Sequence, residues 1–96
     1  MKEFINQIFE IELKAKELGT DKLDRNIRKL KQLMEEEGYT YDVPLDKKYQ
    51  LSDTTIEANF IEPQGQNLIK KVLKPAIFFK RESGLELIQK AIVVVG

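Results

Sequence analysis

Apolar residues in the first part of the chain recur with a helical period. The first stripe consists of Phe4, Ile8, Ile11, Ala15 and Leu18, with Ile5 and Phe9 beside it. Its alternating spacings of four and three residues place the stripe on one face of a helix. Gly19 is expected to end this helix, because glycine adopts positive φ without steric cost. A second helix is predicted before Gly38, with a stripe of Leu23, Ile27, Leu30 and Met34 that Leu33 widens.

The short link between the two stripes predicts an antiparallel helical hairpin. Thr20 is expected to cap the second helix, with Asp21 and Asp24 in its first turn, where the helix dipole favours negative charge. Two helices with one stripe each cannot surround a core. We therefore expect the hairpin to dimerise into a four-helix bundle or to dock on another helix; alternatively, it covers the β region of its own chain. The expected dimer interface consists of Phe4, Ile8, Ile11, Leu23, Ile27, Leu30 and Met34.

After Gly38 the hydrophobic period changes from helical to alternating, which is typical of strands. Apolar segments lie at 39–43, 54–60, 68–73, 77–79, 85–88 and 91–95, with turns expected at 44–46, 63–67 and 82–84. The last run, Ala91–Val95, is apolar on both faces, so we expect it in the centre of a sheet. The predicted fold class is α+β, with a helical dimerisation hairpin at 1–38 and a small all-β domain at 39–96. The β part is expected to be a small barrel or a folded sheet.

The composition removes most kinds of chemistry from consideration. The chain of 96 residues has 16 Lys or Arg against 16 Asp or Glu, and it has no His, Cys or Trp. Catalysis by a thiol or by a Ser–His pair is excluded, as is a zinc site built from thiolates or imidazoles. The glycines lie at segment boundaries and form no phosphate-binding loop. We therefore expect no catalytic residue, no metal and no cofactor, and a protein that is not an enzyme.

The chain carries no sequence signal for a membrane. No apolar run approaches the ~20 residues that a membrane helix needs. The first residues mix charges with apolar side chains and lack the apolar core of a signal peptide. We therefore expect a cytoplasmic protein without a membrane partner.

A basic cluster stands out because no acidic residue occurs between Glu62 and Glu82. It consists of Lys70, Lys71, Lys74, Lys80 and Arg81, with Phe78 and Phe79 nearby. One interpretation is a nucleic-acid-binding face, although zero net charge argues against this for the whole chain. A strand edge protected by lysines is a second interpretation, and a docking surface for an acidic protein partner is a third.

Five short motifs follow one another along almost the whole chain. They are Lys2–Ile8, Leu30–Gly38, Val43–Asp46, Val72–Ile77 and Ala91–Val95. In the same order, the first resembles the helix start K-F-I-N-E-L-L of the GrpE family, and the second its helix leading to a closing glycine. The remaining three are similar to that family's V-P-L-D turn, its V-L-R-P-G-Y segment and its closing A-x-V-x-V strand. The sequence thus resembles the GrpE nucleotide exchange factors of DnaK-type chaperone ATPases.

This resemblance implies a homodimeric co-chaperone rather than an enzyme. In the family, the hairpin dimerises into a four-helix bundle, and the β-domain docks on the ATPase domain and promotes nucleotide release. The coupling comes from differential binding to two conformations of the ATPase. By position, the resemblance implies partner contacts at Leu73, Lys74, Ala76, Glu86 and Val95.

Several positions depart from the family pattern. The resemblance starts at the hairpin, so we expect a short form without the family's long N-terminal helix. Ala76–Ile77 stands where the family has G-Y, and Glu86 and Gln89 stand at two arginine positions of the last hairpin. A glutamate at the first of these reverses the charge at a partner contact. An alternative function is therefore a non-exchanging interaction module on the same scaffold, with a different protein partner.

Overall fold

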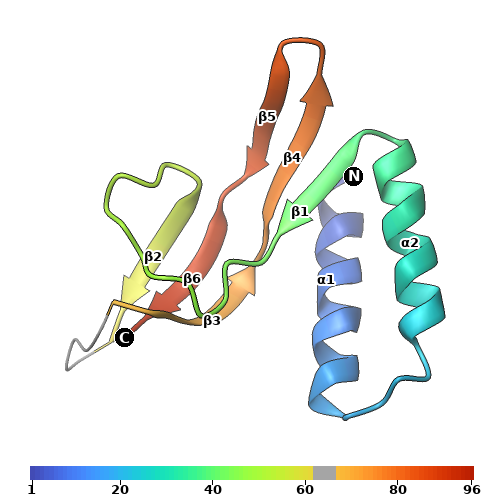
Figure 1. The fold of residues 1–96 in the computed structure, drawn as a ribbon, viewed down its shortest axis with the longest axis horizontal. Coiled ribbons are helices and arrows are strands. Elements are labelled where there is room, and N and C mark those ends of the chain that lie inside the picture. Colours follow the sequence, from blue (N-terminus) through green and yellow to red (C-terminus); the bar gives the residue numbers. More distant parts are fainter. Residues whose placement is uncertain (62–66) are drawn as a thin grey trace.

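The computed structural model describes residues 1–61 and 67–96, in which two helices precede six strands (Figure 1). The elements are α1 (Lys2–Glu17), α2 (Asp24–Glu36), β1 (Tyr39–Asp42), β2 (Ile56–Phe60), β3 (Ile69–Lys74), β4 (Ala76–Arg81), β5 (Gly84–Gln89) and β6 (Ala91–Val95). This confirms the predicted α+β class. Of the turn predicted at 63–67, residues 63–66 lie outside the described residues.

Both helices end at the glycines that the sequence indicated. After Leu18, the last residue of helical geometry, Gly19 has a φ of 66°. The Gly19 and Thr20 amides then donate to the carbonyls of Lys16 and Ala15, which satisfies two helix-end acceptors. At the end of α2, Gly38 has a φ of 93°, and a Cβ there would lie 2.9 Å from the Phe79 ring. Gly38 is therefore required both for the turn and for the close approach of the sheet.

The predicted cap of the second helix is wrong. The N-cap position is Leu23, which makes no side-chain capping bond, and α2 begins at Asp24. The Thr20 hydroxyl accepts a hydrogen bond from the Lys22 amide instead, within the link. The link is longer than predicted because the chain first closes the end of α1 and then makes a turn, in which the Asp24 amide donates to the Asp21 carbonyl. Asp24 does lie in the first turn of α2, whereas Asp21 does not.

The six strands form two three-stranded sheets that share one long bent hairpin. Strand β3 continues into β4 through a bend at Pro75, and β5 continues into β6 through Lys90 (Figure 1). Strands β4 and β5 pair antiparallel in one sheet, and β3 and β6 pair antiparallel in the other. Strand β1 joins β4, giving the order β1-β4-β5, and β2 joins β6 in parallel, giving β2-β6-β3. The central position predicted for Ala91–Val95 is confirmed.

Neither sheet closes on itself within the described residues, so the fold is a folded sheet and the barrel alternative is wrong. The turn predicted at 82–84 is confirmed, since Arg81 pairs with Gly84 across the tip of the hairpin. In Figure 1 this tip extends beyond the rest of the molecule.

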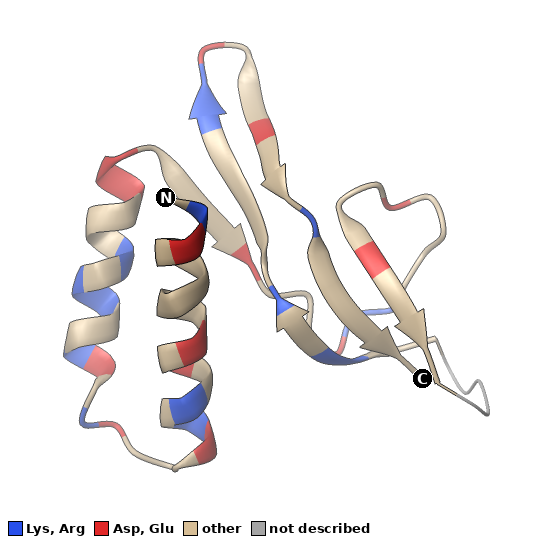
Figure 2. Cartoon of the chain, turned by 180° about the vertical axis from the view of Figure 1, so that it is seen from behind, with Lys and Arg blue, Asp and Glu red and all other residues tan. Residues whose placement is uncertain are grey.

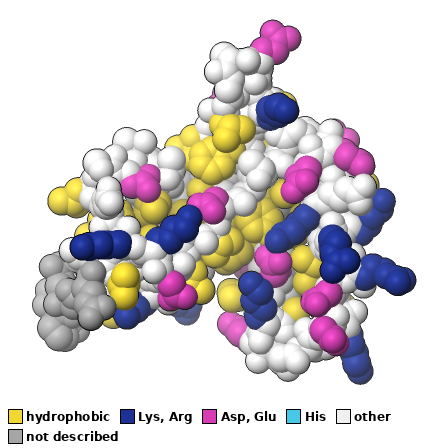
Figure 3. All heavy atoms as spheres, viewed as in Figure 1, with side chains coloured by type: hydrophobic (Ala, Val, Ile, Leu, Met, Phe, Trp, Pro, Cys, Tyr) yellow, Lys and Arg dark blue, Asp and Glu magenta, His cyan; other side chains and the backbone are white. Residues whose placement is uncertain are grey.

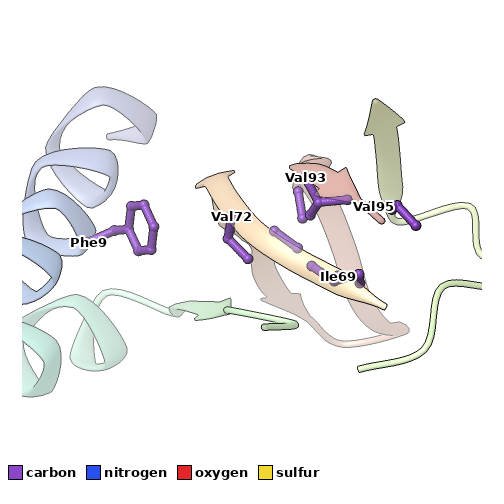
Figure 4. Packing of buried hydrophobic residues seen from close by; sticks show 7 residues of the cluster. Phe9, Ile69, Val72, Val93 and Val95 are labelled. Atoms are coloured by element: carbon purple, nitrogen blue, oxygen red, sulfur yellow. The ribbon is translucent and has the colours of Figure 1, made fainter. Parts of the chain in front are cut away.

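The first cluster of the core lies between α1 and the sheet that contains β3 and β6. Figure 4 shows the ring of Phe9 on α1 pointing toward Val72 on β3, with Ile69, Val93 and Val95 behind it. Phe9 retains little exposure, and Ile69, Val93 and Val95 have almost none. Each such side chain stabilises the fold by about 1.5–3 kcal/mol through removal of apolar surface from water.

A second cluster joins both helices to the other sheet. Ile5 and Ile8 of α1 and Met34 of α2 pack against Ile77 of β4, with Leu30 and Tyr39 at its edge. The hairpin therefore covers the β region of its own chain, as one of the sequence alternatives held. Ile8 and Met34, both expected at a dimer interface, are buried in this cluster. Both clusters cross the boundary at residue 38, so helices and strands share their core.

Candidate docking surfaces

The residues that the resemblance implied as partner contacts divide into accessible and buried ones. Leu73 and Lys74 are exposed at the end of β3, and Leu73 retains 46% of its surface. Glu86 on β5 is half-buried. Ala76 and Val95 have 2% and 1% exposure, so their side chains belong to the core. Leu73 and Lys74 lie in a different sheet from Glu86, which separates the implied contacts into two places.

Glu86 does not present an isolated negative charge. The guanidinium of Arg81 donates from Nη2 to Glu86 Oε1 at 2.9 Å across the β4–β5 hairpin. This hydrogen bond lowers the pKa of Glu86 and raises that of Arg81. Arg81 also lies 5.1 Å from the centre of the Phe79 ring. The charge reversal expected at this position is therefore partly neutralised within the hairpin itself.

Gln89, at the second departure from the family pattern, connects three parts of the fold. Its Nε2 donates to the Pro75 carbonyl at 2.8 Å and to Asn6 Oδ1 at 2.9 Å, and Asn6 Nδ2 donates back to Gln89 Oε1 at 3.0 Å. The reciprocal amide pair holds α1 against the end of β5 and the bend at Pro75. Sequence reasoning missed this role, because the two amides are 83 positions apart and neither belongs to a motif.

A second polar cluster also escaped the sequence analysis. Lys31 Nζ on α2 and the Tyr41 hydroxyl on β1 both donate to the carboxylate of Glu12 on α1, at 2.9 and 3.0 Å. Burial raises the pKa of Glu12, but these two hydrogen bonds outweigh it and leave the pKa below its ordinary value. Burial and the bond to Glu12 raise the pKa of Tyr41. The cluster ties both helices to β1.

Apolar side chains also remain exposed on the helical hairpin. At 3.6 residues per turn, Phe4, Ile11 and Leu18 lie within about 40° of one another on α1, and Ile11 lies about 120° from the sheet-facing Ile5. Phe4 is 51% exposed and Leu18 79% exposed. Leu23 and Leu33 of the second helical segment are exposed as well. We call these residues the outer apolar residues: Phe4, Ile11, Leu18, Leu23 and Leu33.

The basic cluster predicted from the sequence is divided between two sheets. Lys70, Lys71 and Lys74 are exposed on β3, which is an edge strand, whereas Lys80 and Arg81 lie near the hairpin tip (Figure 2). The interpretation of a lysine-protected strand edge is confirmed for β3. In addition, the outer edge of β3 is partly covered, because the Asp46 amide donates to the Ile69 carbonyl.

Two kinds of site are absent from residues 1–61 and 67–96. No group of three or more Asp or Glu side chains there could hold a metal ion. No helix in this part of the chain is both long and apolar enough to cross a membrane.

Comparisons with protein-family models, with curated proteins and with solved structures give no match to this chain. Support for a function therefore comes from the surfaces described above and from the ordered motifs of the sequence.

Proposed function

We propose that the chain is a GrpE-like co-chaperone that docks as a homodimer on the ATPase domain of a DnaK-type chaperone and promotes nucleotide release. The main support is the segment Val72–Ile77, whose sequence resembles the family's V-L-R-P-G-Y segment. This segment forms the bend between β3 and β4, with Pro75 buried and with Leu73 and Lys74 exposed. The motif thus builds a rigid corner that presents an apolar and a basic side chain side by side in sequence.

Dimerisation is supported by the outer apolar residues. Three of the seven residues expected at the interface belong to this set: Phe4, Ile11 and Leu23. A fourth, Leu30, is half-buried at the edge of the second core cluster. A second hairpin packed on them forms a four-helix bundle and removes this apolar surface from water. On dimerisation, the helix faces that contact the sheets stay in contact with them. The four-helix bundle therefore forms without a rearrangement of the single chain.

The proposed exchange mechanism involves no covalent chemistry. The corner at Pro75 contacts one lobe of the ATPase through Leu73 and Lys74 and favours the open state, from which nucleotide leaves. Ala76 and Val95 act as positioning residues, because they are buried beneath the corner and in the central strand. Glu86, paired with Arg81, contributes a polar contact with little net charge.

The test is release of a fluorescent nucleotide from the DnaK-type chaperone of the same organism. We expect faster release with the wild-type chain and a loss of at least about tenfold in apparent affinity for the chaperone with Leu73→Asp, because a charge replaces an apolar contact. Leu51→Asp is a matched control, since Leu51 is 88% exposed on a loop far from the bend in sequence. Unchanged nucleotide release at saturating wild-type protein would contradict the exchange role.

The second candidate function is an interaction module on the same scaffold that binds a different protein and does not promote exchange. The observation that favours it is Glu86, which stands at an arginine position of the family and is engaged by Arg81. Calorimetric titration of the chaperone ATPase domain separates the two functions. An exchange factor must bind the ATPase domain, and Glu86→Arg should bind it with the same affinity as the wild type or with higher affinity. If neither the wild type nor Glu86→Arg binds the ATPase domain, the second function is favoured.

A further inference from the structure

A groove runs between α1 and the β region, apart from the surfaces already described. Its floor is apolar and consists of Phe9, Leu13, Val43 and Leu45. These residues line both a hollow of about 320 Å³ that reaches Tyr41 and a hollow of about 170 Å³ that reaches Val72. The two hollows are therefore parts of one groove. In Figure 3 apolar side chains form a band between the helices and the sheets.

The floor of the groove offers real contact surface. Leu13 and Leu45 are 36% and 46% exposed, so part of each side chain remains accessible to a partner. Phe9 and Val72 are buried beneath them in the core, which fixes the shape of the floor. A large apolar side chain placed between Leu13 and Leu45 would lose its water contacts at no cost in rearrangement.

The rim of the groove carries an excess of positive charge. Lys16 and Lys31 stand on the helical side and Lys70 and Lys71 on the β3 side, against Glu12 and Glu17. Lys31 is engaged by Glu12. Across residues 1–61 and 67–96, Lys16, Lys70 and Lys71 take part in no ion pair. Three lysines without an ion pair therefore line the groove, although the charge of Lys16 also helps to lower the pKa of Glu12. Figure 3 shows basic side chains beside the apolar band.

We propose that this groove binds an acidic peptide segment of a partner protein. One large apolar side chain of the peptide lies between Leu13 and Leu45, and its carboxylates face Lys16, Lys70 and Lys71. The charges orient the peptide and speed its association, and the apolar anchor supplies most of the affinity.

The geometry favours a peptide over other anionic partners. A membrane surface is flat, so it would meet the lysine rim without reaching an apolar floor that lies between α1 and the sheet. Nucleic-acid bases need exposed aromatic faces for stacking, but Phe9 is buried and Lys31 Nζ lies over the Tyr41 ring, 5.2 Å from its centre. A peptide can place one side chain on the floor while its backbone follows the groove between the lysines.

The groove is separate from the surfaces of the proposed co-chaperone function. Its lining contains neither Leu73 nor Lys74 nor Glu86, and it contains none of the outer apolar residues. Val72 lines it, whereas Leu73 does not. Peptide binding can therefore be measured whether or not the chain promotes nucleotide release.

The test is fluorescence anisotropy of three labelled peptides with the full chain. The first alternates Glu and Leu around a central Phe, the second replaces every Glu with Lys, and the third replaces Phe and Leu with Ser. We expect binding of the first peptide only, and weaker binding as salt rises from about 50 to 300 mM, because exposed charge pairs are screened. Methyl resonances of Leu13, Val43 and Leu45 should shift on titration.

Variants locate the site. Lys70→Glu combined with Lys71→Glu should weaken binding by at least about tenfold, and Leu13→Gln should do so without altering charge. The matched controls are Lys29→Glu combined with Lys80→Glu, and Leu51→Gln, all at exposed positions outside the groove. Circular dichroism of each variant confirms that the fold is kept.

The proposal is overturned by any of three results. The first is equal binding of the acidic and basic peptides. The second is equal loss of affinity in the groove variants and in their matched controls, or no loss in the groove variants. The third is failure of the acidic peptide to bind while anionic vesicles of phosphatidylserine and phosphatidylcholine do bind, since that would make the lysine rim a membrane contact.

Discussion

The helical hairpin carries two sets of apolar residues, and the chain buries only one of them. Ile5, Ile8 and Phe9 of α1 are buried against the strands. Phe4 and Ile11, on the same helix, remain accessible to solvent. The sequence pattern contains both sets in one broad stripe, wider than contact with a single partner requires.

The difference teaches that one helix can carry residues for the core of its own chain beside apolar residues that this core does not use. The sheet-facing residues account for the stability of the single chain, because they join α1 to both core clusters. The outer apolar residues lie outside that core, and in the dimer that we propose a second hairpin would cover them. Substitutions on the two faces should therefore have effects of different size and different dependence on protein concentration.

The largest effect is expected from a charge on the sheet-facing side. Ile5→Asp buries an unpaired carboxylate among Ile8, Met34 and Ile77 and should cost several kcal/mol, enough to unfold most of the protein. Circular dichroism should show loss of helix and of cooperative melting. Gln7→Asp, at an exposed position two residues along α1, is the control and should lose only about 0.5 kcal/mol, because it removes an exposed hydrogen bond to Glu10 and leaves the core intact.

A pair of phenylalanines sharpens the same comparison with a smaller change. Phe9→Ala should lower the free energy of unfolding by about 3 kcal/mol, because it leaves a cavity between α1 and Val72. Urea denaturation should give this loss at every protein concentration. Phe4→Ala should lower the apparent stability only where the dimer forms, so that its effect depends on concentration. Equal, concentration-independent losses for both variants would contradict the distinction between the faces.

The amide pair that holds α1 against the bend comes next in size. Gln89→Ala removes three hydrogen bonds, including the one to the Pro75 carbonyl, and leaves the Asn6 amide without its partner. We expect a loss of about 1 kcal/mol in urea denaturation, since the site is only partly buried. The double variant with Asn6→Ala should lose little more than Gln89→Ala alone, because both changes remove the same pair. If the loss in the double variant equalled the sum of the losses in the two single variants, the amides would act independently.

The smallest effect concerns pH and the cluster around Glu12. Because folding lowers the pKa of Glu12, its contribution to stability is present above the ordinary carboxyl pKa of about 4.3 and is lost as pH falls through the lower folded value. The contribution is a few tenths of a kcal/mol, since the pair is partly exposed and screened. Between pH 7 and pH 3 the wild type should lose slightly more stability than Glu12→Gln. A larger loss of stability in Glu12→Gln than in the wild type would contradict a lowered pKa of Glu12 in the folded chain.

The helices, the strands and the helix ends could largely be predicted, because each depends on residues that are close together in the sequence. Helical period, alternation and the positive φ of Gly19 and Gly38 each depend on neighbouring residues, and the elements follow them. The cap at Thr20 was wrong because two ways of ending α1 and starting α2 compete within the same few residues. The apolar run Ala91–Val95 indicated its central place, but not that β2 pairs with it in parallel.

The surfaces were less predictable than the elements. Whether Ile5 or Ile11 faces the sheet depends on how the hairpin docks, which the stripe alone leaves open. The bonds between Asn6 and Gln89, and between Glu12 and Tyr41, join residues far apart in sequence. The burial of Ala76 and Val95 likewise depends on the bend at Pro75, which brings the two sheets together only in the folded chain.

The most direct test of the two-faced hairpin is sedimentation equilibrium of the wild type and of Ile11→Asp at micromolar concentrations. The outer apolar residues predict a dimeric wild type and a monomeric Ile11→Asp with the same circular dichroism spectrum, because the charge lies outside the core of the single chain. A well-folded monomer for the wild type across this range would contradict the central claim that a second hairpin covers the outer face.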